Sequence, residues 1–216
     1  MYLKYKLYDN SDNNTSNVIK EVLKNRGIED YDKYLNLDDS VVIPYDKLDN
    51  INSAVELFNK HFQCKNKIGI IPDPDVDGQC SASEAYSYIK RMDSEYPITI
   101  LYHQNTKAHG LDDITVPDDI KLLIVPDAGT NDYIQCRELK ERGIDVLILD
   151  HHEQEDENSY ALIVNNQCSR HYKNKQLCGG GIVYKWMKAL DDFYWNDFAD
   201  DYLDLVAFSN ISDVMD

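Results

Sequence analysis

Short apolar runs alternate with longer polar stretches from Lys67 onward, and this spacing constrains the fold more than any other feature of the chain. We predict strands at five apolar runs, namely Ile68–Ile71, Ile98–Tyr102, Leu122–Val125, Val146–Leu149 and Leu162–Val164. Helices are expected between them at about Ser81–Met92 and Asp132–Arg142, the second ending at Gly143. Such alternation is typical of βαβ units. The sequence therefore predicts an α/β fold, in which a parallel sheet is flanked by helices.

The first 63 residues show a different pattern. Apolar residues recur there at helical spacing, near 18–23 and again over 51–62, and Asn50 stands where it can cap the second helix. We expect residues 1–63 to form a helical lead-in and residues 64–216 to form the α/β domain. Two further helices are predicted after Gly181, ending near Leu190 and Phe208.

Acidic residues and histidines follow three of the predicted strands. The first strand runs into Asp73-Pro-Asp75-Val-Asp77-Gly78, the third into Asp127-Ala-Gly129, and the fourth into Asp150-His151-His152. In an open parallel sheet, the carboxyl ends of the strands share one edge, and ligands bind in the crevice there. We therefore expect these side chains to converge in space.

Several carboxylates in one crevice would repel one another and take up protons unless cations lay among them. A divalent metal is the simplest explanation. Oxygen ligands with one or two imidazoles and no thiolate favour Mn²⁺, or Mg²⁺ as an alternative, over zinc. The number of candidate ligands indicates two ions.

Two of these motifs also have a simpler interpretation. The three aspartates of the first motif alternate, so an extended segment directs them to one side, but a solvated acidic loop that caps the next helix explains them equally well. Asp127 alone suits the N-cap of the following helix, although its place at the tip of a buried strand favours a ligand. The adjacent pair His151-His152 is more specific, because two histidines directly after an apolar strand are a poor choice for packing.

Two segments offer groups that can bind a phosphate. The run Gly179-Gly180-Gly181 precedes an apolar helix, so its amides can cradle a phosphate at the helix N-terminus, although a flexible turn explains the run equally well. Lys107 and His109 follow the second strand and offer a cation and an imidazole to a scissile phosphate.

The charge of the chain weighs against a nucleic-acid substrate. The 22 basic and 39 acidic residues leave a formal net charge of −17, which argues against a broad electropositive surface. A nucleic-acid substrate stays possible in two ways. Bound cations could cancel part of the acidic charge, or a DNA-binding domain could lie outside this chain.

Cellular location and redox state are also constrained. No run approaches the roughly 20 apolar residues that cross a bilayer, and residues 1–6 lack the apolar stretch of a signal peptide. We expect a cytoplasmic protein without membrane contact. The 5 cysteines are scattered and include no Cys-x-x-Cys pair, so neither a disulfide framework nor a structural zinc site is indicated.

The ordered set of motifs resembles the DHH phosphoesterase superfamily, and within it the RecJ-type single-strand exonucleases. The family is named for the triplet that stands here as 150–152, and its other motifs match 73–78, 125–129 and 177–185. The opening stretch 22–28 and the closing stretch 204–215 are similar to RecJ-type proteins in particular.

The resemblance implies a ligand set and a reaction. A pair of Mn²⁺ ions would be held by Asp75, Asp77, Asp127, His151 and Asp213, with Asp127 bridging and Asp73 close by. His152 would face the substrate phosphate, assisted by Lys107, His109 and the glycine run. The implied activity is 5′–3′ exonucleolytic hydrolysis of single-stranded DNA in repair or recombination.

Two alternatives remain open. One is a DHH phosphoesterase for small substrates, such as short oligonucleotides, cyclic dinucleotides or pyrophosphate, which suits the acidic charge better. The other is a non-catalytic scaffold of the same fold. Because RecJ-type enzymes continue into a second domain that closes over the nucleic acid, the resemblance also implies a separate C-terminal domain or a protein partner.

Overall fold

The chain divides into two compact units, Met1–Val42 and Ile43–Asp216. The computed structural model describes residues 15–38, 41–105 and 107–215. The first unit contains α1 (Thr15–Asn25) and α2 (Tyr31–Leu35). Asp30 caps α2, because its side chain accepts a hydrogen bond from the amide of Lys33.

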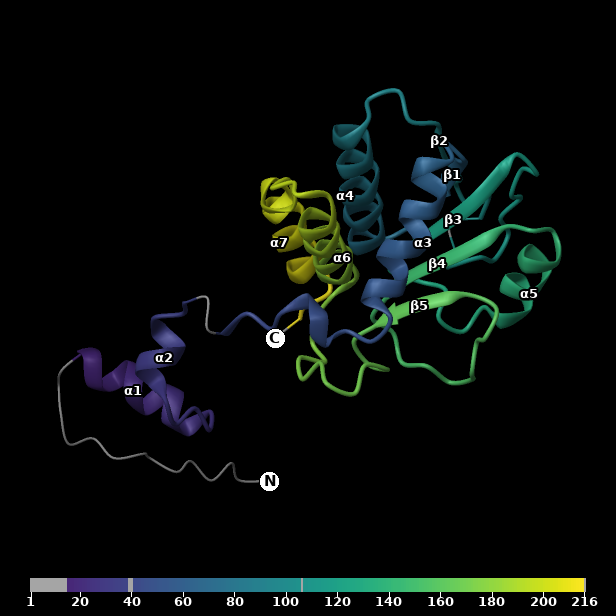
Figure 1. Cartoon of the computed structure of the whole chain (residues 1–216). Coiled ribbons are helices and arrows are strands. Elements are labelled where there is room, and N and C mark those ends of the chain that lie inside the picture. Colours follow the sequence, from purple (N-terminus) through teal and green to yellow (C-terminus); the bar gives the residue numbers. More distant parts are fainter. Residues whose placement is uncertain (1–14, 39–40, 106, 216) are drawn as a thin grey trace, which may run out of the picture. The chain divides into compact units, whose positions relative to one another are not determined.

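The second unit is built on one sheet of five parallel strands (Figure 1). In sheet order β2-β1-β3-β4-β5, the strands are Ile98–Ile100, Lys67–Ile70, Ile120–Pro126, Asp145–Asp150 and Leu162–Asn165. Every pairing is parallel. The prediction of an α/β fold with a parallel sheet flanked by helices is therefore confirmed.

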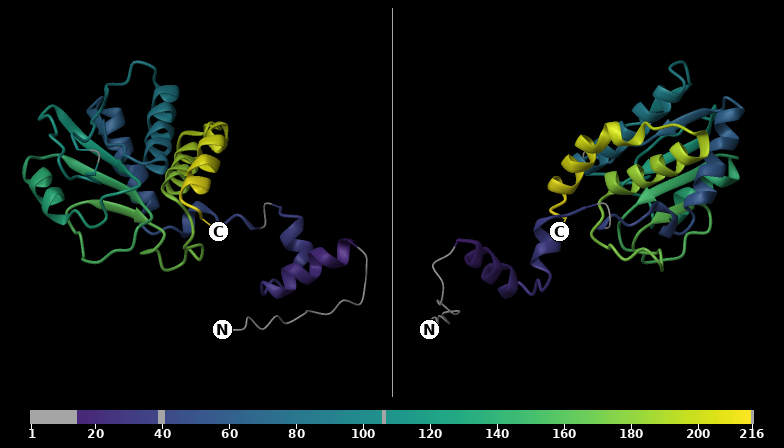
Figure 2. Two further views of the ribbon diagram at one scale, coloured as in Figure 1. Left: turned by 180° about the vertical axis from the view of Figure 1, so that it is seen from behind. Right: turned by 60° about the vertical axis from the view of Figure 1, so that its left-hand side comes forward.

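Helices cover both faces of this sheet (Figure 2). One face carries α3 (Ile51–Gln63), α4 (Val76–Met92) and α6 (Gly179–Tyr194), and α7 (Leu203–Ser212) packs on α4 and α6. The opposite face carries α5 (Tyr133–Glu141). Two short 3-10 helices, η2 (Tyr45–Lys47) and η3 (Ala199–Tyr202), lie in the connections.

Strand β3 shows why the strands are continuous apolar runs rather than alternating ones. Leu122 and Ile124 are buried in the core beneath α3, α4 and α6, whereas Leu123 and Val125 are buried in the core beneath α5. Both faces of the strand are thus removed from water, and each apolar residue buried in this way contributes about 1.5–3 kcal/mol.

Local signals in the sequence account for most element ends. Gly143 follows α5 with φ +73°, and its amide donates to Lys140 O while the amide of Ile144 donates to Leu139 O. This is a Schellman motif, so the predicted stop at Gly143 is confirmed. Asn50 holds the N-cap position of α3, but its side chain donates to Ile163 O instead of capping the helix.

Two boundaries differ from those expected. Helix α4 begins at Val76, earlier than predicted, because the carboxylate of Asp75 accepts a hydrogen bond from Gly78 N at 2.8 Å and caps it. Helix α3 belongs to the compact unit that carries the sheet, because its apolar side packs on α6, β3 and β5. The boundary between the two compact units falls after Val42, whereas we expected a boundary after residue 63.

Candidate metal centre

The candidate site lies where the order of the strands reverses. The chain places β2 on one side of β1 and β3 on the other, so the loops after β1 and β3 diverge at their carboxyl ends. Ligands of open α/β sheets bind at this point. The loop after β1 carries the first acidic motif, and the loop after β3 carries Asp127.

Asp77 is anchored by the start of α6. Its Oδ2 accepts a hydrogen bond from Gly179 N at 2.7 Å, and its Oδ1 accepts one from Gly180 N at 2.8 Å. The amide of Gly181 donates to Cys178 Sγ, which caps the helix. These three amides are thus already bound, which corrects the expectation that the glycine run cradles a phosphate: the run fixes the orientation of a carboxylate instead.

The same glycines allow the close approach of α6 to the strand ends. A Cβ atom at Gly179 would lie 2.3 Å from Asp127 Oδ1 and 2.6 Å from Asp127 Cβ. A Cβ atom at Gly180 would lie 2.3 Å from Ser209 Oγ. Both contacts are shorter than van der Waals packing allows, so side chains at these two positions would displace the candidate ligand and α7.

Asp127 is held in an unusual backbone conformation. Its φ is +67°, and its amide donates to Leu149 O at 2.8 Å. Strained backbone of this kind persists where the surrounding structure requires it, and it is common at functional sites. Burial, reinforced by the charges of Asp77 and Asp75, raises the pKa of Asp127 to about 11. A cation at this carboxylate would remove that penalty.

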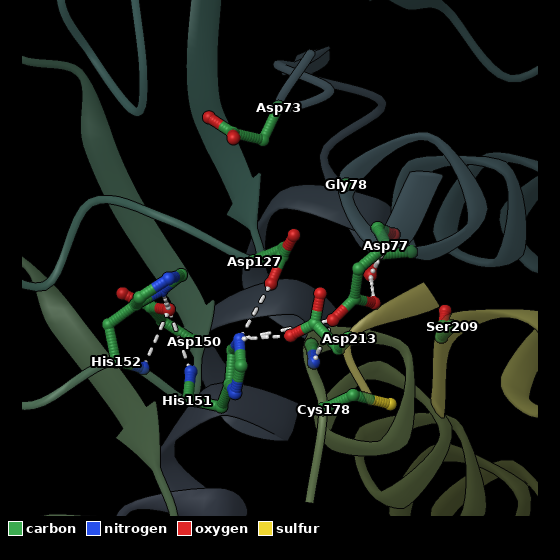
Figure 3. Close-up of polar contacts among 12 residues, drawn as sticks. Asp73, Asp77, Gly78, Asp127, Asp150, His151, His152, Cys178, Ser209 and Asp213 are labelled. Atoms are coloured by element: carbon green, nitrogen blue, oxygen red, sulfur yellow. Dashed lines mark hydrogen bonds and ion pairs between the residues drawn. The ribbon is translucent and has the colours of Figure 1, made fainter. Parts of the chain in front are cut away.

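The imidazole of His151 lies among three carboxylates (Figure 3). Its Nε2 atom is 3.2 Å from Asp127 Oδ1, 3.3 Å from Asp213 Oδ2 and 3.9 Å from Asp77 Oδ2. Both His151 Nε2 and Asp127 Oδ1 are buried, and within the described chain neither forms a hydrogen bond. Buried polar atoms without partners are costly, so their convergence fits a divalent cation.

All six expected metal ligands meet around this point. Their ligand atoms form three groups in which every pair of atoms lies within 4.8 Å: Asp127, His151 and His152; Asp77, His151 and Asp213; Asp73, Asp75 and Asp127. Asp127 and His151 each belong to two groups. Carboxylate oxygens with imidazole and no thiolate are a donor set that Mn²⁺ accepts.

Asp150 orients the histidine pair, a role that the sequence did not reveal. Its Oδ1 accepts hydrogen bonds from the amides of His151 and His152 at 2.7 and 3.1 Å, and from His152 Nδ1 at 2.8 Å. Burial alone would raise the pKa of Asp150, but the bonds and charge of His152 lower it to about 2. The bond to Asp150 in turn raises the pKa of His152 to about 9.

A second carboxylate–imidazole pair faces the same site. Asp73 accepts from His109 Nδ1 at 2.9 Å through one oxygen and from Gly110 N at 3.0 Å through the other. This bond raises the pKa of His109. Asp132, which the sequence indicates only as the start of a helix, accepts from Leu111 N at 2.7 Å and so anchors the loop that carries His109.

A cavity of about 390 Å³ lies beside these groups. Its walls include Asp73, Asp75, His109, Asp150 and His152, and none of its lining residues is Lys or Arg. Lys107 is exposed and does not line the cavity, so the structure does not bring it to the site.

Comparisons with known proteins agree with this geometry. Residues 67–209 match the family model described as the DHH family, N-terminal domain. A Bacillus subtilis (strain 168) protein, provisionally named an SPbeta prophage-derived single-strand DNA-specific exonuclease, YorK, is 40% identical over 99% of this chain and 37% of its own length. The single-stranded-DNA-specific exonuclease RecJ of Haemophilus influenzae is 29% identical over 78% of this chain and 32% of its own length.

Solved structures share the fold. RecJ from Thermus thermophilus in complex with Mn²⁺ superposes with a TM-score of 0.71 at 19% identity, covering 89% of this chain and 28% of that chain. Another exonuclease RecJ bound to manganese gives a TM-score of 0.68 at 20% identity, covering 78% of this chain and 44% of that chain.

The chain spans 37% and 32% of the lengths of the two sequence relatives named above. Within the described residues, no helix is both long and apolar enough to cross a bilayer. The family match covers the strands, the acidic motifs and the histidine pair. The chain therefore belongs to the DHH family, and residues 67–209 form the N-terminal domain of that family.

Proposed function

We propose that this chain is the catalytic part of a metal-dependent phosphodiesterase that removes nucleotides from the 5′ end of single-stranded DNA, in repair or recombination. One observation carries the proposal: His151 Nε2 lies within 4 Å of three carboxylates, on Asp77, Asp127 and Asp213. The names of the relatives support single-stranded DNA as the substrate.

The donor groups would hold two divalent ions, and Asp127 belongs to two of the three groups. Mn²⁺ is the preferred ion, because the donor set is oxygen-rich and RecJ structures contain manganese. Mg²⁺ is the alternative, since a RecJ structure with Mg²⁺ is also known. When bound, such a pair supplies Lewis acidity and lowers the pKa of a nucleophilic water.

The chain itself supplies two imidazoles that face the cavity. His152 and His109 each use Nδ1 to bind a buried carboxylate, which leaves Nε2 of each ring for the substrate. Asp150 raises the pKa of His152 to about 9, so this imidazole keeps its proton near neutral pH, and Asp73 raises the pKa of His109 as well. They can therefore donate to the oxygens of a phosphate in the cavity and stabilise the charge that develops there.

The proposal includes a further domain or partner. The relatives are longer than this chain, and the cavity lining contains no Lys or Arg that could hold a long strand. A domain or protein with a basic surface would supply that grip. A cytoplasmic location stays a prediction from the sequence.

The acidic cavity also favours a second candidate, a phosphoesterase for small substrates. Five aspartates line it, Asp73, Asp75, Asp112, Asp132 and Asp150, and they would repel a long polyanion more than a dinucleotide. The non-catalytic scaffold is the least supported alternative, because every expected ligand is present in the cluster.

One assay separates the three. The chain is incubated with Mn²⁺ and either a 5′-labelled single strand or a cyclic dinucleotide, with EDTA as the control. Release of labelled mononucleotide as the first product is the expected result. Cleavage of the cyclic dinucleotide alone would favour the small-substrate enzyme. Bound metal without hydrolysis of either substrate would favour the scaffold for this chain on its own.

A further inference from the structure

A groove of about 320 Å³ lies between α4 and β2, next to the metal centre. Tyr86 lines it from α4, and Tyr102 lines it from the loop that follows β2. Ala82 and Ile100 also line it and add apolar surface. We propose that this groove binds a base of single-stranded DNA, next to the scissile phosphate, by stacking on Tyr86 and Tyr102; this inference rests on the proposed function.

Both tyrosine rings are available to a ligand. Tyr102 is 68% exposed and Tyr86 is 37% exposed. In the part of the chain that the structure describes, neither hydroxyl forms a hydrogen bond and neither ring packs against another aromatic ring. A half-exposed ring that is otherwise unpaired offers its face to a planar partner.

The groove shares its wall with the metal centre. Pro72 lines the groove and directly precedes Asp73. Gln79 also lines the groove, and its side-chain amide donates to Asp73 O at 2.9 Å. A base in the groove would thus contact the loop that carries the candidate ligands, which places its phosphate at the same edge of the sheet.

Charge identifies the part of the nucleic acid that fits here. None of the residues lining the groove is charged, whereas the neighbouring cavity contains five aspartates. A net charge of −17 opposes binding of a strand mainly through its phosphates. Stacking on neutral rings supplies affinity that depends little on salt and accepts every base.

Binding is measured by fluorescence anisotropy with a labelled oligothymidylate and with an abasic strand of equal length, which keeps the phosphates and lacks the bases. Ca²⁺ serves as the divalent ion, and gel electrophoresis verifies that the strands stay intact. The variants are Tyr86→Ala and Tyr102→Ala, with Tyr86→Phe and Tyr102→Phe as ring-preserving controls. Tyr160→Ala removes an exposed tyrosine from the loop before β5, away from the groove.

We expect the wild type to prefer the oligothymidylate, and each alanine variant to bind it about fivefold or more weakly, with abasic binding unchanged. The phenylalanine variants and Tyr160→Ala should keep the preference. Equal binding of both strands by the wild type, or full affinity in both alanine variants, would overturn the stacking proposal. Cleavage of single strands by the Mn²⁺-loaded wild type is measured separately. The stacking proposal can therefore be disproved while the proposed function stands.

Discussion

The Nε2 atom of His151 and the Oδ1 atom of Asp127 lie 3.2 Å apart in the interior, yet neither forms a hydrogen bond within the described residues. This distance is within hydrogen-bond range, but the two atoms do not meet the geometry of a hydrogen bond, so their approach fits two ligands that converge on one cation. The electrostatic cost of this arrangement is lowest when a cation is bound.

Replacing Asp127 with Asn tests this relationship directly. Asn tolerates the φ of +67° at this position, so the backbone is retained while the charge is removed. At Mn²⁺ concentrations about 100-fold above Kd, the wild type should gain about 2.7 kcal/mol of unfolding free energy, and the variant should gain much less. Thermal unfolding with and without Mn²⁺ measures both. An equal gain in the variant would show that Asp127 holds no ion.

Replacing Asp150 with Asn should lower the pKa of His152. The carboxylate of Asp150 raises that pKa to about 9, so wild-type His152 carries a proton at about pH 7.5. Without the negative charge, the pKa should move toward the ordinary value of about 6.5, and most of the imidazole should be neutral at about pH 7.5. NMR titration of the His152 ring in the metal-free protein measures the change. An unaltered titration would remove Asp150 from its orienting role.

Replacing Gly179 with Ala should impair hydrolysis. The new Cβ atom would lie 2.3 Å from Asp127 Oδ1, so the carboxylate must move. A displacement of about 1 Å at a catalytic group can cost about 100-fold in rate. Mn²⁺-dependent cleavage of a labelled strand provides the measurement.

Gly181→Ala is the matched control for that substitution. Its Cβ atom would meet the end of the Leu177 side chain rather than a candidate ligand. We expect a loss of unfolding free energy of about 1–3 kcal/mol from overpacking, with the rate per folded molecule close to that of the wild type. Equal rate losses in both variants would argue against a specific effect on Asp127.

Replacing Glu84 with Gln should make stability less dependent on pH. Glu84 is fully buried without a hydrogen bond among the described residues, and burial together with the charges of Asp77 and Asp204 raises its pKa well above the ordinary value. The folded state therefore holds this proton more tightly than the unfolded state. Its contribution is fully present below about pH 4.3 and is lost as pH rises toward the folded pKa.

The free energy of unfolding of Glu84→Gln, relative to the wild type, should therefore increase between about pH 5 and about pH 8. The slope is at most about 1.4 kcal/mol per pH unit for a single proton. Urea denaturation in EDTA at the two pH values measures it. A difference that is the same at both pH values would show that Glu84 ionises as readily in the folded state as in the unfolded state.

The amino-acid sequence alone was sufficient to locate the strands, the helix stop at Gly143 and the candidate ligands. These features depend on local patterns: apolar runs that are buried on both faces, a glycine that adopts positive φ, and acids that follow strands. Because parallel strands end at one edge, the convergence of Asp77, Asp127 and His151 also followed from the order of the motifs.

The pairing of polar groups, by contrast, was set by tertiary packing. The amides of Gly179 and Gly180 bind Asp77, more than 100 positions earlier in the chain, instead of remaining free for a phosphate. Likewise, Asp132 anchors the loop that carries His109, and Lys107 lies outside the cavity lining. A sequence pattern sets the conformation of a segment, but the partner of a buried donor depends on which distant segments pack against it, and that is decided when the sheet and its helices assemble.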